Sequence, residues 1–161
     1  MSRRILTTAA AAIALLCLGG TTAMASTPVS GAGTFQLTLA PVSTRSVDGN
    51  TFINFTFHET ISGSWSGTRV GHGDLVIHPD GTVNVSDSGV FTGTVAGSAP
   101  GTAILSAEAS GTFSAVSAQG VIGDGTAGLT GVHGQAFVTG AATGPTSFAG
   151  TYTGRAQFGA P

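Results

Sequence analysis

The sequence predicts a single all-β domain, a closed eight-stranded antiparallel barrel that follows an N-terminal export signal. Apolar and polar residues alternate along most of the chain, with the period of two that is typical of strands. The chain also contains 26 glycines, a load that no helix tolerates because each interior glycine costs about 1 kcal/mol relative to alanine. Short turn signals recur at regular intervals, as in up-and-down barrels and sandwiches. We prefer the barrel, because closure removes exposed strand edges and the chain has no lysine to protect them.

Residues 1–25 have the organisation of an export signal. Arg3-Arg4 supplies the positive start, Ile5–Leu18 is apolar and rich in alanine, and Ala23-Met24-Ala25 supplies small residues ahead of a cleavage site before Ser26. The apolar run is shorter than the roughly 20 residues that a membrane-spanning helix needs. We therefore expect a secreted, extracellular protein without a stable membrane anchor, and leave open whether the general or the twin-arginine route exports it.

The remaining residues, 26–161, are expected to form one barrel domain with its core at about 31–158. They include three arginines, no lysine and seven carboxylates. This mildly acidic balance offers no basic surface for nucleic acid or an anionic membrane. The single cysteine, Cys17, lies in the signal, so no internal disulfide is expected. Nine phenylalanines spread along the chain are enough for an apolar core.

The first four strands are separated by clear turn signals. Residues 34–39 and 53–61 alternate apolar and polar side chains, and a third strand is predicted over 68–78. His78-Pro79-Asp80-Gly81 follows as a hairpin turn, because proline presets one turn angle and glycine accepts a positive φ. A fourth strand is predicted from Thr82 to about Val95.

Four more strands follow the turn at Ala99-Pro100-Gly101. They are predicted over residues 102–109, 112–122, 128–139 and 146–158, which completes a set of eight.

The segment from Gly123 to Gly134 has a glycine at about every third position. Glycines in strands mark bulges, sharp corners or places where two backbones approach closely, and these features curve a sheet into a small barrel. We therefore expect the segment to have a structural role, carried by the positions Gly125, Leu129, Gly131 and Gly134.

The same segment carries a family resemblance. Gly125-Thr126-x-x-Leu129-x-Gly131-x-x-Gly134, followed by Phe137, resembles the signature of a secreted bacterial family of unknown function within the allene oxide cyclase-like barrels. Ser110-Gly111-Thr112-Phe113 and Pro79-Asp80-Gly81 lie in the order that this family shows. The resemblance spans about residues 31–158 and implies an eight-stranded barrel, distantly similar to dirigent proteins. His133 and Gln135 depart from the usual arginine and glutamate, and the resemblance transfers no catalytic residue.

Two carboxyl groups, Glu59 and Asp87, are the candidates for catalysis. Glu59 has the parity of Phe55 and Phe57, and Asp87 has the parity of Phe91. Unbroken strands would point both groups into an apolar interior, where desolvation raises a carboxyl pKa and suits it to acid–base catalysis. A bulge after Glu59, at the Ser-Gly pairs, would instead turn it to solvent. The bulge is the interpretation that we prefer.

The remaining polar candidates are expected on the outer surface. His72 and Asp74 share a strand face at a spacing that could hold a metal, but metal sites normally need three ligands, so no metal is expected. His58 and Glu59 are adjacent and must point to opposite faces. Glu108 is also expected to face solvent.

Three functions remain open. The first is a barrel that binds a small apolar ligand, lined by Phe55, Phe57 and Trp65, with Tyr152 a further aromatic candidate. The second is a cofactor-independent isomerase or cyclase that uses Glu59 or Asp87, as the resemblance to allene oxide cyclases would allow. The third is a structural or surface-interaction module with a filled core. The sequence has no nucleophile elbow, phosphate-binding loop or cysteine pair, so we expect no cofactor and favour binding over catalysis.

Overall fold

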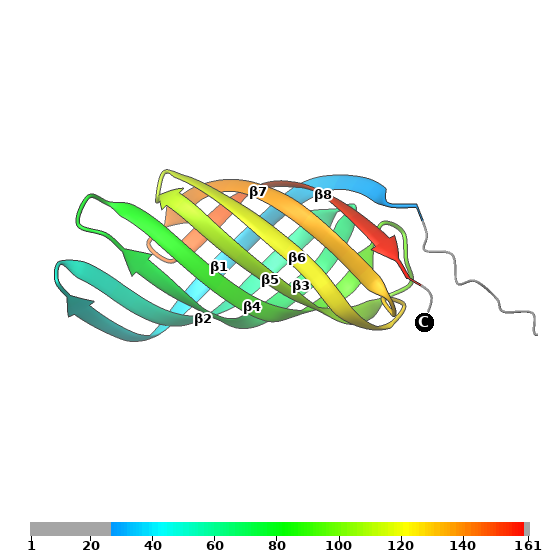
Figure 1. Cartoon of the computed structure of the whole chain (residues 1–161), viewed down its shortest axis with the longest axis horizontal. Helices are drawn as coiled ribbons and strands as arrows, with labels where there is room; N and C mark the ends of the chain where they lie inside the picture. Colours follow the sequence, from blue (N-terminus) through cyan, green and yellow to red (C-terminus); the bar gives the residue numbers. More distant parts are fainter. Residues whose placement is uncertain (1–26, 160–161) are drawn as a thin grey trace, which may run out of the picture.

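The computed structural model describes residues 27–159, which form eight strands and no helix. The predicted signal peptide and its cleavage site before Ser26 lie outside the described residues. The strands are β1 (Val29–Val47), β2 (Asn50–Gly63), β3 (Trp65–Ile77), β4 (Thr82–Val95), β5 (Gly101–Thr112), β6 (Ala115–Ala127), β7 (Val132–Gly144) and β8 (Ser147–Phe158) (Figure 1). The predicted all-β class and the number of strands are confirmed.

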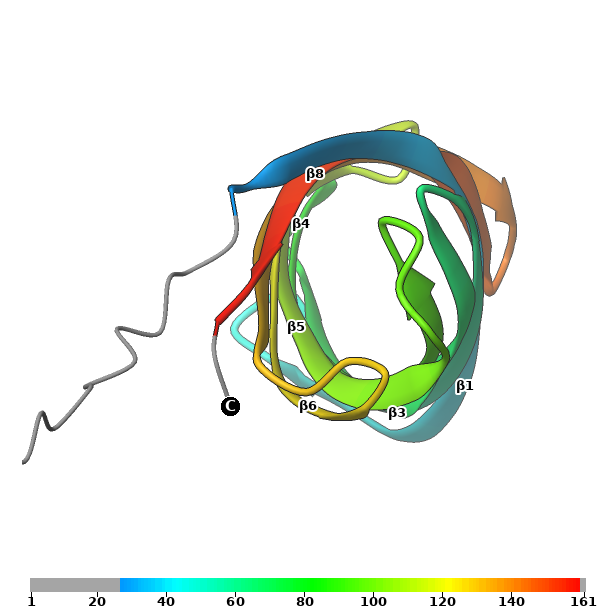
Figure 2. The same ribbon diagram turned by 90° about the vertical axis from the view of Figure 1, so that its right-hand side faces the viewer.

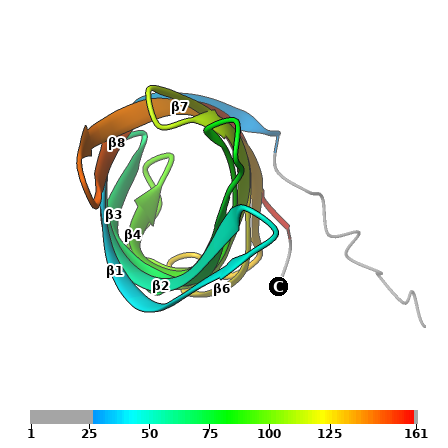
Figure 3. The same cartoon turned by 90° about the vertical axis from the view of Figure 1, so that its left-hand side faces the viewer.

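The eight strands close into a ring, the barrel that Figures 2 and 3 show from its two ends. Each strand pairs antiparallel with the next, and β1 also pairs with β8, from Val29 opposite Ala156 to Thr38 opposite Ser147. Closure gives every strand a hydrogen-bonded neighbour on both sides over most of the ring, and the unpaired edge that remains is residues 40–47 of β1, which pair with β2 alone.

Several predicted strand boundaries are wrong, and two of the errors fall on turns. The strand expected over 112–122 begins at Ala115, because Phe113-Ser114 forms the turn between β5 and β6. The strand expected over 128–139 begins at Val132, because 128–131 is a turn. Phe113-Ser114 contains no glycine or proline, so the apolar alternation continues through it and hides the turn in the sequence.

Because the strands run up and down, their connections alternate between the two ends of the barrel. One end, here the terminal end, holds the start of β1 and the end of β8 together with the loops 96–100 and 128–131. The other, the hairpin end, holds the turns 48–49, 78–81 and 113–114.

Two apolar clusters fill the interior. The larger contains Ile61, Trp65, Phe91, Val95, Ala103, Leu105, Ile122, Leu129, Val132, Ala136, Tyr152 and Ala156. The smaller contains Phe55, Phe57, Leu75 and Val83, with Leu39 and Val116 among the partly buried residues packed against it. The pairing registers place the larger cluster toward the terminal end and the smaller one toward the hairpin end.

Glycines on the inner wall give room to aromatic rings from other strands. A Cβ at Gly73 would lie 2.6 Å from Cζ of Phe55, its partner across β2 and β3. A Cβ at Gly140 would lie 2.9 Å from Cζ of Phe35. The rings therefore lie over bare backbone, and the glycine load is partly a packing requirement of the interior.

Candidate functional site

The barrel encloses a cavity of about 120 Å³ that all eight strands line. Its wall is mainly apolar, and its larger side chains are Phe35, Leu37, Leu39, Phe55, Ile61, Trp65, Leu75, Val83, Val85, Leu105, Val116, Val138, Phe148 and Tyr152. The charged residues of the wall are Glu59, Arg69 and Asp87.

The two ends of the barrel differ in how deeply their side chains are buried. Leu129 and Val132, at the turn between β6 and β7, have no exposed surface and belong to the cluster that fills the terminal end. At the hairpin end Leu75 and Val83 are buried, whereas Leu39 and Val116 are only partly buried and Phe113 is 37 % exposed. The Phe113 and Phe148 rings lie 6.1 Å apart at this end. Phe113 is therefore the one exposed residue of the cavity lining.

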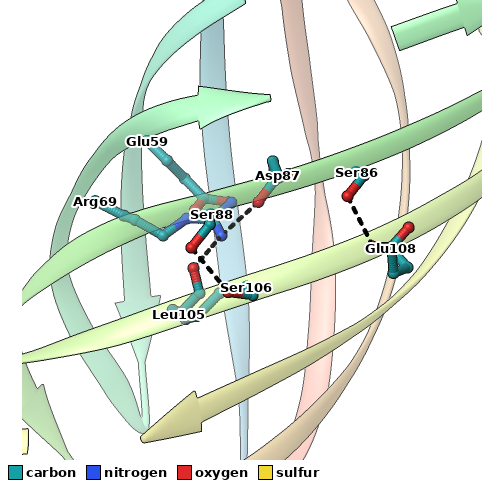
Figure 4. Close-up of polar contacts among 8 residues, drawn as sticks. All are labelled: Glu59, Arg69, Ser86, Asp87, Ser88, Leu105, Ser106 and Glu108. Carbon is teal, nitrogen blue, oxygen red and sulfur yellow. Dashed lines mark hydrogen bonds and ion pairs between the residues drawn. The ribbon is translucent and has the colours of Figure 1, made fainter. Parts of the chain in front are cut away.

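Arg69 of β3 is the centre of the polar part of the wall (Figure 4). The residue is 3 % exposed, and its Nε donates to Oε2 of Glu59 at 2.7 Å. Its Nη1 donates to Oδ1 of Asp87 at 2.8 Å and to the carbonyl oxygen of Leu105 at 3.2 Å. The guanidinium carbon also lies 4.5 Å from the centre of the Phe57 ring, a cation–π contact. One guanidinium thus holds two carboxyl groups from two other strands.

Glu59 faces the interior, so the preferred bulge interpretation is wrong. The β2–β3 register is continuous from Thr51 to Ile61, and it places Glu59 directly opposite Arg69. Glu59 is 7 % exposed. The Ser-Gly pairs lie at the hairpin between β2 and β3, where the chain reverses at Ser64, and they leave the alternation at Glu59 intact. The simple parity argument therefore placed this carboxyl correctly.

Asp87 also points inward from β4, as its parity with Phe91 indicated. Its side chain is 10 % exposed and lies at the cavity wall opposite Gly73 and Ala107 on the flanking strands. Both neighbours are small, which leaves space for the carboxyl to reach the guanidinium of Arg69. The two candidate carboxyls are therefore brought together at one site.

Burial raises the pKa of both carboxyl groups. For Glu59, desolvation is the largest effect, Arg69 opposes it, and the negative charge of Asp87 adds to it. For Asp87, desolvation again raises the pKa against the opposing effect of Arg69. Two carboxylates facing one guanidinium leave one negative charge uncompensated, so the pair titrates as a unit that retains a proton more readily than exposed carboxyls do.

Sequence reasoning gave Arg69 no role. Its inward-facing neighbours at positions 67, 71 and 73 are glycines, while Val70 lies on the outer face and is 52 % exposed. The apolar alternation that marks the inner face of β2 is therefore absent from β3. One sequence pattern could have indicated that Arg69 faces the interior. Glycines alternate with other residues along its strand, and the preceding strand carries an inward carboxylate that needs a cation.

Only some of the aromatic residues that were predicted to line the cavity do so. Phe55 and Trp65 lie on the cavity wall, whereas Phe57 packs in the smaller apolar cluster and contacts Arg69. Tyr152 lies deep in the barrel rather than at its mouth. Its hydroxyl accepts from the backbone N–H of Trp65 at 2.7 Å and donates to the backbone carbonyl of the same residue at 3.0 Å. These two bonds fix the ring pair, with centroids 5.8 Å apart, toward the terminal end of the barrel.

The other polar candidates lie on the outer surface, as expected. His58, His72 and Asp74 are exposed, and Asn54 donates a hydrogen bond to Asp74. Within residues 27–159 no group of three or more metal-ligating side chains lies close enough together to hold a metal ion. Glu108 is also exposed and accepts a hydrogen bond from Ser86 at 2.7 Å (Figure 4).

The glycine-rich segment forms the turn between β6 and β7 at the terminal end. A Cβ at Gly125 would overlap the carbonyl oxygen of Leu129, and one at Gly134 would lie 2.8 Å from the Arg155 carbonyl oxygen. Gly131 has φ +73° and lies against Gly159. The backbone N–H of Gly159 donates to the carbonyl oxygen of Gly131 at 2.8 Å. Neither these glycines nor Leu129 lines the cavity, and Leu129 is buried in the larger apolar cluster at the terminal end.

Comparison with known proteins identifies the fold and no activity. The structure is similar to the crystal structure of a protein of unknown function from the DUF3224 family of Shewanella oneidensis, with a TM-score of 0.66 at 15 % identity. The match covers 84 % of this chain and 99 % of the other. No protein-family model and no curated protein sequence matches the chain. Within residues 27–159, no helix is long and apolar enough to cross a bilayer. The chain thus shares an all-β fold with a protein of unknown function.

Proposed function

We propose that this protein is a secreted barrel of the allene oxide cyclase-like type that binds a small apolar molecule in its interior. The observation that carries the proposal is the apolar cavity of about 120 Å³ with three charged side chains gathered on one part of its wall. Small eight-stranded barrels either fill their interior with side chains or hold one small ligand. An apolar pocket with a few convergent polar groups is the usual form of a ligand site.

The buried ion cluster supports binding over a purely structural role. Taking charged groups out of water is costly, and replacing a buried ion pair by apolar residues is often neutral or stabilising. A filled structural core would therefore gain little from Glu59, Arg69 and Asp87. Charged groups with perturbed pKa values beside a cavity are instead typical of functional sites.

Size indicates which ligands to test. Apolar cavities of about 150 Å³ remain dry and bind benzene, so the cavity here suits a single ring or a short aliphatic chain. Trp65 is the only tryptophan of the chain and lies on the cavity wall. Its fluorescence therefore reports occupation of the cavity directly.

The test is a titration of the purified protein with toluene, followed by Trp65 fluorescence and by thermal unfolding. Binding is expected to change the emission and to raise the unfolding temperature with ligand concentration. Ala118→Leu, which fills the cavity from β6, should abolish both effects. Ser117→Leu adds the same side chain on the exposed outer face of the same strand and should preserve them. Equal binding by wild type and Ala118→Leu would contradict the proposal.

A second candidate, a cofactor-independent isomerase or cyclase, rests on the two inward carboxyls. A carboxyl with a raised pKa beside an apolar cavity is suited to move a proton on a bound substrate. Catalysis predicts that a molecule recovered from the cavity is converted by wild type and not by Glu59→Gln or Asp87→Asn. Binding without turnover would favour the first function.

A further inference from the structure

The ion cluster in the cavity is not electrically balanced. Arg69 is the one cation on the wall, and both Glu59 and Asp87 bond to it. No lysine exists in the chain, and the other arginines among the described residues, Arg45 and Arg155, are exposed on the outside. When both carboxyls are ionised, the interior carries one negative charge without a partner.

The hydrogen bonds of the cluster use only part of the carboxyl groups. Arg69 contacts Oε2 of Glu59 and Oδ1 of Asp87. These bonds leave Oε1 of Glu59 and Oδ2 of Asp87 as acceptors, and Nη2 of Arg69 as a donor, on a wall that is otherwise apolar. Among the described residues, every fully buried side-chain nitrogen or oxygen has a hydrogen-bond partner. The two remaining oxygens therefore face space that a ligand or solvent can reach.

This arrangement discriminates between ligands by charge. A carboxylate ligand would bring a third negative charge to a guanidinium that is already shared by two, and an unpaired buried charge is strongly unfavourable. A neutral ligand would leave the excess charge as it is. A ligand with a protonated amine would supply both the missing positive charge and the donors that the two carboxylate oxygens lack.

We propose that the cavity is specific for small apolar amines, with the ammonium group held by Glu59 and Asp87 and the apolar body lying against the aromatic wall. This inference rests on the proposed ligand-binding function and adds the chemical class of the ligand. It excludes fatty acids and other carboxylates as natural occupants of the cavity.

The test compares four probes with the same ring: benzylamine, benzyl alcohol, benzoate and toluene, titrated at pH 7 with Trp65 fluorescence as the signal. Benzylamine is protonated at this pH, as an amine of lysine-like pKa is. We expect it to bind at least about tenfold more tightly than benzyl alcohol, which corresponds to about 1.4 kcal/mol. Benzoate should bind at least about tenfold more weakly than benzyl alcohol, because like charges repel in a medium of low dielectric.

The outcomes separate the two proposals. Benzyl alcohol or benzoate binding as tightly as benzylamine would overturn the amine specificity while leaving the binding function intact. Failure of all four probes to bind would overturn the binding function itself.

Variants test the assignment to the carboxyls. Asp87→Asn removes one negative charge, so that one carboxylate faces one guanidinium and the cluster has no net charge. The tenfold preference for benzylamine over benzyl alcohol should therefore disappear. Glu108→Gln removes an exposed carboxylate that bonds to Ser86 outside the barrel, and it should keep the preference. Far-UV circular dichroism establishes that each variant is folded. A folded Asp87→Asn protein with an unchanged preference would contradict the assignment.

Discussion

Removal of the Arg69 guanidinium is the most direct test of the ion cluster, and Arg69→Met does so with a side chain of similar length. The substitution leaves two carboxyls, 9 % and 10 % exposed, without the cation that each contacts at 2.7 and 2.8 Å. Breaking a buried ion pair by removing one partner typically costs about 3–5 kcal/mol. We expect a loss of that size in the free energy of unfolding at pH 7.5.

The loss should depend strongly on pH. At pH 5 the two carboxyls, whose pKa values burial already raises, can take up protons once the cation is gone. The cost should then fall toward that of the three lost hydrogen bonds, about 0.5–1.5 kcal/mol each.

Urea unfolding of wild type and Arg69→Met at both pH values measures this difference. Arg155→Met, at an exposed position of β8, is the control and should stay within about 0.5 kcal/mol of wild type. A loss below about 1 kcal/mol at pH 7.5, or an equal loss at both pH values, would refute the argument that Arg69 is the shared cation partner of two buried carboxyls.

Four further predictions concern pH, glycines and export. Because the pKa of Glu59 is raised above its ordinary 4.5, the folded state binds more protons than the unfolded state, and stability should fall as pH rises above that value. Glu59→Gln should flatten this dependence in urea unfolding, and an unchanged slope would contradict the assignment. Gly131→Val places a branched side chain at φ +73° with its Cβ 2.6 Å from the Gly159 carbonyl oxygen, so thermal unfolding should show a loss of about 2–3 kcal/mol. Gly120→Ala, whose Cβ would meet nothing closer than 3.5 Å, should instead stabilise by about 0.4–1 kcal/mol, and a loss would show that the inner wall has no room there. N-terminal sequencing of the exported protein should give Ser26 as the first residue, and a product that retains Cys17 would contradict the predicted cleavage of the export signal.

Local sequence patterns predicted much of the fold. Alternation over 53–61 placed β2 within Asn50–Gly63, and Pro79-Asp80-Gly81 marked the turn between β3 and β4. These features are local, since strand period and turn chemistry depend on a few neighbouring residues. The turn at Phe113-Ser114 contains no proline or glycine and does not interrupt the alternation, which is why the predicted start of the next strand was wrong.

Local sequence patterns were not sufficient to predict the candidate site. Parity pointed Glu59 and Asp87 inward, yet the choice between an unbroken strand and a bulge at Glu59 depended on pairing with β3. Only the register, with Glu59 opposite Arg69, decided it. Whether glycine-rich strands keep their alternation depends on their partners, because glycine itself favours no face.

The sequence by itself determined the all-β class, the eight strands and the two carboxyls with inward parity. The tertiary structure alone decided that Arg69 joins those carboxyls, that Phe57 packs beside the cluster instead of lining the cavity, and that Leu129 is buried in the larger apolar cluster at the terminal end. Strand period is a property of neighbouring residues along the chain. The cavity and its charges are set instead by contacts between strands that are distant in sequence, and by aromatic rings that fill the space left by glycines on other strands.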